Sequence, residues 1–211
     1  GGYPQAAEIN AALGRLAGEF GLLFELGSQR AMLDHPELTE TYRVTRDATP
    51  DGRAFIAANI GISHLIPQPG RPALKLAQLQ ELIDAVQADA IVVHLNYLQE
   101  ALQKNGDTAV HGALGAIGEC AAALAVPLIV KETGSGLPPD LARDLAACGV
   151  AALDTGGAGG TSMARLEARR AEITGDADRA RLGDAFAGWG LPSVVSLMAA
   201  RSSGLPLIAG G

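Results

Sequence analysis

The chain has 211 residues, enough to build one sizeable hydrophobic core. Hydrophobic residues make up 48% of it and charged residues 18%, which is typical of a well-buried globular domain and excludes a largely disordered chain. The formal net charge of −7 argues against nucleic acid and anionic membrane surfaces as partners, and no apolar stretch approaches the roughly 18 residues that a membrane span needs.

Strands and helices are predicted to alternate along the chain. Short and nearly continuous apolar runs indicate strands that are buried on both faces, and apolar residues at helical spacing indicate helices between them. In chain order we predict a helix at 4–20, strands at 21–27 and 54–61, a helix at 76–88, a strand at 90–96, a helix at 111–125, a strand at 126–132, a helix at 138–149, a strand at 150–157, a charged helical excursion at 164–188, a helix at 193–203 and a strand at 205–211.

This alternation predicts βα units around a parallel sheet, and both a doubly wound sheet and a (β/α)8 TIM barrel fit it. Two features favour the barrel. Polar residues recur at the C-terminal ends of the predicted strands, where barrel active sites lie, and no GxGxxG motif follows the first strand. Because a barrel needs eight strands, we expect one incomplete barrel domain at 1–211 that lacks the first strand and the region after the seventh.

The strand at 90–96 ends in an unusual group of polar residues. His94, Asn96, Gln99 and Glu100 follow one another within seven positions of "DAIVVHLNYLQEALQKNGD". Other predicted strands end in the same way, with Ser28, Gln29 and Arg30, with Asn59, with Lys131 and Glu132, with the glycine-rich stretch 154–161, and with Gly210 and Gly211. In a barrel these residues converge on one rim, and so they predict a binding site.

The residue types suggest what the site binds. Asn and Gln side chains suit the edges of a heteroaromatic ring, and a lysine at a strand end can face the N1–C2=O side of a flavin. Glycine-rich turns expose backbone N–H groups to phosphate. Structural explanations remain open for single residues: His94 as a structural histidine, Glu100 as a helix-start residue favoured by the helix dipole, and Lys131 as an ion-pair partner of Glu132 or Asp154.

Several stretches together resemble type 2 isopentenyl-diphosphate isomerases. The resemblance runs through nearly the whole chain in order, and "GSQR" and "HLNYLQE" are its most specific parts. The other stretches are "GGYPQAAEIN", "NIG", "VPLIVKETGSG", "DTGGAGGTS" and "WGLPS". The resemblance implies an FMN-dependent TIM barrel, commonly a homotetramer, that interconverts isopentenyl and dimethylallyl diphosphate. It also implies a flavin reduced by NADPH or NADH, a requirement for Mg²⁺ and no net redox change.

The resemblance also assigns roles to residues. The expected FMN-binding residues are Ser28, Asn59, Lys131, Gly156, Thr161, Gly210 and Gly211. The expected substrate-binding residues are Ser28, Gln29, Arg30, Asn96 and Gln99, the expected catalytic residues are His94 and Gln99, and the expected Mg²⁺ ligand is Glu100. A single carboxylate suits Mg²⁺, which usually keeps waters and takes phosphate oxygens beside one or two protein ligands.

The sequence also departs from the family pattern. The N-terminal Arg-Lys substrate motif of the family is absent, and Met163 stands where the family often has Trp. Two other classes therefore stay open: another FMN-dependent TIM-barrel oxidoreductase, and a barrel that binds FMN without catalysis. We interpret Cys120, Cys148 and Trp189 as packing residues and expect a cytoplasmic protein, because no signal peptide opens the chain and no cysteine spacing indicates a metal site.

Overall fold

The structure is a computed structural model that describes residues 1–49 and 54–210. Within these residues one parallel sheet holds the strands β1 (Leu23–Glu25), β2 (Phe55–Gly61), β3 (Ala90–Leu95), β4 (Leu128–Glu132), β5 (Ala152–Asp154) and β6 (Leu207–Ile208). All six predicted strands are thus confirmed, although β1, β5 and β6 are shorter than the apolar runs that predicted them.

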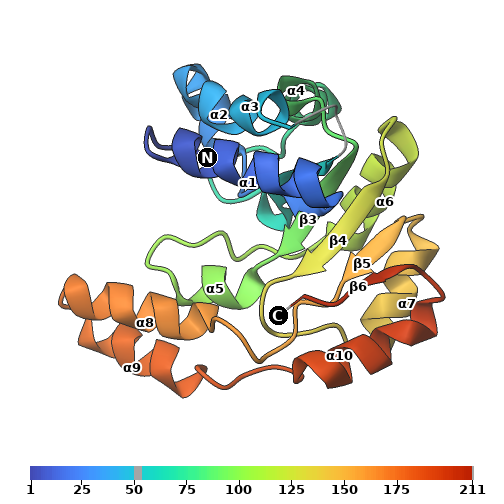
Figure 1. Ribbon diagram of the computed structural model, residues 1–211. Coiled ribbons are helices and arrows are strands. Elements are labelled where there is room, and N and C mark those ends of the chain that lie inside the picture. The colour runs from blue at the N-terminus through green and yellow to red at the C-terminus, as the bar shows by residue number, and fades with distance from the viewer. Residues whose placement is uncertain (50–53, 211) are drawn as a thin grey trace.

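The strand order decides between the two candidate folds. The order is β1-β2-β3-β4-β5-β6, and every neighbouring pair is parallel (Figure 1). A doubly wound sheet reverses its order at a switch point, whereas in a barrel each strand lies beside its neighbours in the sequence. The described chain is therefore an α/β fold with a curled, six-stranded half-barrel, and the complete eight-stranded barrel stays a prediction.

Most of the helices lie between successive strands in the chain. The helices are α1 (Ala6–Phe20), α2 (Arg30–Asp34), α3 (Glu40–Asp47), α4 (Leu76–Val86), α5 (Tyr97–Leu102), α6 (Ala113–Ala123), α7 (Pro139–Ala147), α8 (Met163–Ile173), α9 (Ala177–Ala185) and α10 (Ser193–Ala200). Short 3-10 turns lie at Pro36–Leu38, Ile62–His64 and Arg201–Ser203. None of the helices in the described part of the chain is both long enough and apolar enough to cross a membrane.

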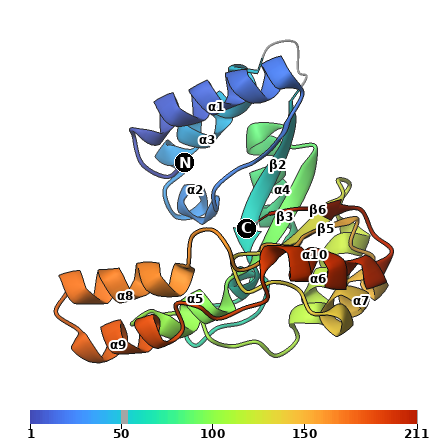
Figure 2. The ribbon, with the colours of Figure 1, turned by 60° about the horizontal axis from the view of Figure 1, so that its bottom comes forward.

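The predicted helical excursion at 164–188 is confirmed. It consists of two helices, α8 and α9, which form a hairpin beside α5 (Figure 1, Figure 2). Gly175 separates the two helices with a φ of 77°, and the Asp176 side chain then caps α9 by accepting from the backbone N–H of Arg179 at 3.1 Å. Helix α3 was missed because it buries Thr41 and Thr45 with a single Tyr, which gives no apolar periodicity.

The two faces of the sheet differ in what they bury. The outer face packs on helices α4, α6 and α7 in the main hydrophobic core, which includes Leu82, Ile117 and Leu145. The inner face carries a small cluster, with Ala57, Val92 and Ile129 among its members. Polar side chains continue this inner face toward the C-terminal strand ends, and the candidate site begins there.

Candidate active site

One row of residues crosses the inner face at the C-terminal ends of four strands. The strand register pairs Gly61 with His94, His94 with Lys131, and Lys131 with Asp154. Side chains in register on neighbouring strands point to the same face of a sheet. The row therefore places an imidazole, an ammonium and a carboxylate side by side.

Lys131 lies between two carboxylates. Its Nζ is 2.9 Å from Glu25 Oε2 and also binds Asp154, which is almost fully buried. Burial raises the pKa of Glu25 more than the Lys131 ammonium lowers it, and Glu25 Oε1 is buried with no hydrogen-bond partner. Burial works against the ammonium, yet the hydrogen bonds to Asp154 and Glu25 leave the pKa of Lys131 raised. Lys131 is therefore cationic.

Glu132 is not the partner of Lys131, although the sequence left that pairing open. Its Oε2 accepts backbone N–H groups of Gly134 at 2.9 Å, Ser135 at 2.5 Å and Gly136 at 3.1 Å. Burial raises the pKa of Glu132, and these hydrogen bonds offset only part of that effect. The Glu132 side chain thus shapes the loop after β4, which lines the site.

His94 is held by Asn59 on the neighbouring strand. His94 Nδ1 and Asn59 Oδ1 are 2.6 Å apart, and Asn59 Nδ2 donates to the Leu26 carbonyl at 2.6 Å. Burial, helped by the nearby Lys131 charge, lowers the pKa of His94 to about 4, so the ring is neutral at physiological pH. Gln29, which is fully buried, accepts from the Asn59 backbone N–H at 2.9 Å and donates to the Leu82 carbonyl at 3.0 Å.

Helix α5 carries the polar residues that follow β3. It begins at Tyr97, so Gln99 and Glu100 lie in its first turn. Asn96 Nδ2 donates to Glu100 Oε1 at 2.7 Å, and the Asp107 backbone N–H donates to Glu100 Oε2 at 2.9 Å. Asn96 Oδ1 is buried with no partner and remains available to a donor.

A second carboxylate, which the sequence did not reveal, lies beside α5. Glu167 on α8 is 6% exposed, and its Oε1 accepts from Gln99 Nε2 at 2.8 Å. Gln103 and Arg170 also donate to this oxygen, at 3.3 and 2.8 Å. Glu100 is the only carboxylate of the sequence stretch 94–100, and the fold adds Glu167 from outside that stretch. The missing signal is the fold of the α8–α9 hairpin, because 68 positions separate Gln99 from Glu167.

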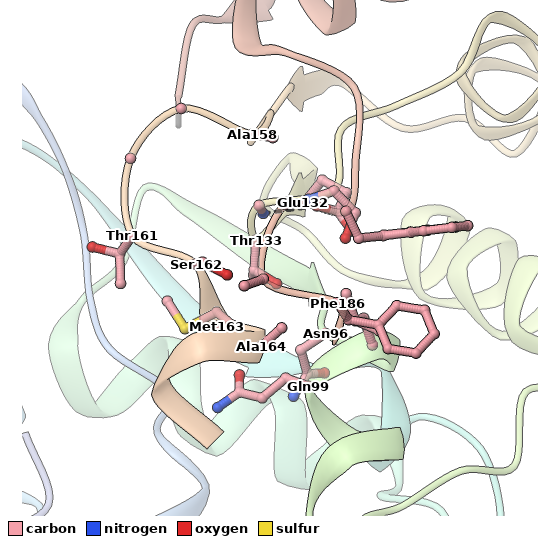
Figure 3. A pocket seen from close by; sticks show the side chains of 18 of the residues that line it. Asn96, Gln99, Glu132, Thr133, Ala158, Thr161, Ser162, Met163, Ala164 and Phe186 are labelled. Carbon is pink, nitrogen blue, oxygen red and sulfur yellow. Dashed lines mark hydrogen bonds between the residues drawn. The ribbon is translucent and has the colours of Figure 1, made fainter. Parts of the chain in front are cut away.

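Asn96, Gln99 and Glu132 line a pocket of about 320 Å³ at the C-terminal ends of β3, β4 and β5. Figure 3 shows Asn96 and Gln99 on one side of it, and Thr161 and Ser162 on the loop that leads into α8. Apolar side chains complete the wall, among them Leu95, Leu98, Met163, Phe186 and Trp189. An adjoining pocket of about 380 Å³ is lined by Lys131, Thr161 and the glycine-rich loop. Trp189 packs edge-on against Phe186, with the ring centroids 5.6 Å apart, although it is 60% exposed.

Three known proteins that are similar to this chain share one name. The chain is 43% identical over 213 residues to an isopentenyl-diphosphate delta-isomerase of Methanoregula boonei and 46% identical over 213 residues to one of a Synechococcus species. A protein of the same name from Halobacterium salinarum is 42% identical over 198 residues, 93% of this chain. The chain is a homologue of isopentenyl-diphosphate delta-isomerases. This confirms the resemblance found in the sequence.

The Methanoregula and Synechococcus matches cover all of this chain but only part of each relative. The chain spans 57% of the Methanoregula protein and 58% of the Synechococcus protein. No protein-family model matches the chain. The relationship to the isopentenyl-diphosphate delta-isomerases therefore rests on these whole-chain identities and on the residues of the site.

The remaining predicted site residues lie at the same rim in different settings. Ser28 is exposed, and its carbonyl accepts the Tyr42 hydroxyl at 2.8 Å. Arg30 Nη2 forms an ion pair with Asp34 at 2.8 Å. Thr161 is exposed and lines both pockets. Their contacts with substrate or FMN stay predictions.

The glycines of the site have a structural reason as well. At Gly156, where φ is 39°, a Cβ would lie 1.8 Å from the Glu132 carbonyl oxygen. At Gly210 a Cβ would lie 2.2 Å from Asp154 Oδ1. Close backbone approach therefore explains both glycines without a ligand, and phosphate binding by them stays a prediction. Gly211 lies outside the described residues.

Proposed function

We propose that the full-length protein interconverts isopentenyl and dimethylallyl diphosphate, with FMN reduced by NADPH and with Mg²⁺. The observation that carries this proposal is the identity of 43–46% to proteins of that name across the whole described site. We also propose that it works as a homo-oligomer, as the sequence resemblance implies.

The donor set of the rim fits a flavin. Lys131 supplies a cation at a strand end, Asn59 an amide, and Thr161 a hydroxyl beside a glycine-rich backbone loop. The Asn59 amide uses one donor and one acceptor position within the protein and keeps the others. A reduced FMN would supply the group that moves a proton without net redox change.

The groups around α5 fit a diphosphate and its metal ion. Each Glu100 oxygen accepts one hydrogen bond and keeps a lone pair for a cation. No cluster of three potential metal-binding side chains exists among the described residues, which suits Mg²⁺ held by one carboxylate and by phosphate oxygens. Arg30 would bind phosphate oxygens at the same rim.

Other residues of the site would bind the hydrocarbon chain and take part in proton transfer. Leu95, Leu98 and Met163 offer an apolar wall to a hydrocarbon chain. Gln99 would orient the reacting alkene end. The buried Glu167 that accepts from Gln99 lines the neighbouring pocket beside Gln103 and Arg170, and it would hold or release a proton next to Gln99. Neutral His94 offers its Nε2 as an acceptor within the same site.

The test uses the full-length protein with FMN, Mg²⁺, isopentenyl diphosphate and a catalytic amount of NADPH in deuterated water. We expect dimethylallyl diphosphate that carries solvent deuterium, in large excess over the NADPH oxidised. One NADPH consumed for each product molecule would instead show an oxidoreductase. FMN binding without any product would show a non-catalytic flavin-binding barrel.

A further inference from the structure

Arg71 connects two loops beside the site. It lies in the loop between β2 and α4, and its Nη2 forms an ion pair with Asp107 in the loop between α5 and α6. The side chains of Arg71 and Asp107 are 23% and 28% exposed, so this pair is less screened by solvent than a surface pair. A second link joins the same loops, because Gln68 accepts from the Ala109 backbone N–H at 3.0 Å and donates to the Ala109 carbonyl at 3.2 Å.

Both terminal nitrogens of the Arg71 guanidinium are engaged within the protein. Its Nη1 lies 2.6 Å from His64 Nδ1, and its Nη2 also reaches the Ser63 carbonyl at 3.4 Å. Since Arg71 can only donate, His64 Nδ1 accepts and the His64 proton resides on Nε2. The guanidinium therefore has both terminal nitrogens occupied and is built to hold neighbouring groups in place.

Asp107, the partner of Arg71, is itself hydrogen-bonded to Glu100. The backbone N–H of Asp107 donates to Glu100 Oε2 at 2.9 Å, while Asn96 fixes Oε1. If the Asp107 side chain is released, the only described donor to Glu100 Oε2 is free to move with its loop. The ion pair, together with a weaker hydrogen bond from Ser63 Oγ to Asp107 Oδ2 at 3.4 Å, therefore helps to hold the donor that orients the Glu100 carboxylate.

We propose that Arg71 is a positioning residue that holds Glu100, through Asp107, in the orientation that binds the metal ion. The inference rests on the proposed function, in which Glu100 is the Mg²⁺ ligand. Removal of a group that orients a metal ligand typically weakens metal affinity about 10–100-fold.

The test measures Mn²⁺ binding to the FMN-loaded full-length protein in the presence of inorganic diphosphate, by electron paramagnetic resonance. We expect Arg71→Gln to weaken Mn²⁺ binding about tenfold. Turnover at saturating Mg²⁺ and the affinity for FMN should stay close to wild type. A merely structural role would instead lower stability and turnover without moving the metal affinity.

Arg179→Gln is the matched control. Arg179 Nη1 donates to the carbonyls of Leu102 at 3.2 Å and Gln103 at 2.8 Å, so it supports the start of the same loop without touching Asp107 or Glu100. We expect its Mn²⁺ affinity to equal that of wild type. Equal weakening by both arginine variants would mean general loosening of the loop and would overturn the inference.

A double variant separates the inference from the proposed function. If Arg71 acts through Glu100, adding Arg71→Gln to Glu100→Gln should cause no further loss of Mn²⁺ affinity. An additional tenfold loss in the double variant, or no loss in Arg71→Gln alone, overturns the inference. If Glu100→Gln itself binds Mn²⁺ like wild type, the metal assignment of the proposed function fails, and the inference fails with it.

Discussion

His94 and Asn59 meet through one ring nitrogen and one amide oxygen, 2.6 Å apart on neighbouring strands. Because Asn59 Nδ2 donates to the Leu26 carbonyl, the Asn59 oxygen is the acceptor and His94 Nδ1 carries the proton. The other ring nitrogen of His94 is then an acceptor beside Gly61. Arg71 imposes the opposite tautomer on His64. At the rim, Nε2 of His94 is therefore an acceptor and Nε2 of His64 is a donor.

The His94 tautomer can be tested with Asn59→Asp. A carboxylate in place of the amide favours the imidazolium, so the pKa of His94 should rise from about 4 toward its ordinary value of 6.5. Nitrogen NMR of the labelled ring should show a neutral Nδ1–H form in wild type at pH 6. A wild-type ring protonated on Nε2 alone would contradict the structure.

The low pKa values of both histidines predict acid sensitivity. Burial lowers the pKa of His94 and of His64 to about 4, with Lys131 adding to the effect at His94 and Arg71 and Arg30 adding to it at His64. In the unfolded chain each ring binds a proton near pH 6.5, but in the folded protein only near pH 4. The free energy of unfolding should therefore fall as the pH drops from 6.5 to 4. Above that window the two neutral rings make their full contribution to stability.

Denaturant titrations across this pH window measure the effect. We expect the slope of the unfolding free energy against pH to be smaller in the variant with both His64→Gln and His94→Gln. The reduction should be at most the contribution of two bound protons. His35→Gln is the control, because His35 is exposed and its ion-pair partner among the described residues is the surface residue Glu37. An unchanged slope in the double variant would mean that both rings titrate alike in the folded and unfolded chains.

The sequence predicted the strands and much of the rim, and particular residues show why. Buried parallel strands have apolar runs as their sequence pattern, so they can be predicted from the sequence. Once the sheet forms, its register aligns His94, Lys131 and Asp154. Partners distant in sequence could not be predicted in this way. Glu167 reaches Gln99 only because α8 and α9 fold back onto α5.

Glu25 was missed although a signal existed. It is the one charged residue within the apolar run "GLLFELG", and a charge in a buried strand requires a partner. The partner, Lys131, lies on a strand that is not adjacent to β1. Only the curl of the sheet brings the two together across the inner face.

Removal of the Lys131 charge should destabilise the fold. Lys131→Met leaves Glu25 and Asp154 without their shared cation, and breaking a buried pair costs about 3–5 kcal/mol of unfolding free energy. Adding Glu25→Gln removes one of the two uncompensated carboxylates and should restore part of that loss. Arg143→Met is the control: its pair with Asp140 is exposed, so it should cost less than about 1 kcal/mol. Equal losses of unfolding free energy in Lys131→Met and Arg143→Met would contradict a stabilising role for the cluster of Glu25, Lys131 and Asp154.

Glu100→Gln tests the metal site through activity. The change keeps the size of the side chain and removes its charge, so we expect at least a tenfold loss of turnover at low Mg²⁺ and a weaker apparent Mg²⁺ affinity. FMN binding and the folded state should persist. Initial rates across a Mg²⁺ titration measure this. If Glu100 is only a helix-start residue, the substitution should cost less than about 1 kcal/mol of stability and leave turnover intact.

Glu167→Gln tests whether the second carboxylate takes part in the chemistry. A glutamine can keep the contact with Gln99, but it cannot hold or release a proton, so we expect turnover to fall about 10²–10⁴-fold while Mg²⁺ and FMN affinities change little. Glu172→Gln, on the same helix but more exposed and paired only with Arg169, is the control and should keep full turnover. Single-turnover rates with isopentenyl diphosphate would measure both. If Glu167→Gln turns over like wild type, Glu167 only anchors Gln99, Gln103 and Arg170, and the proton must come from another group at the rim.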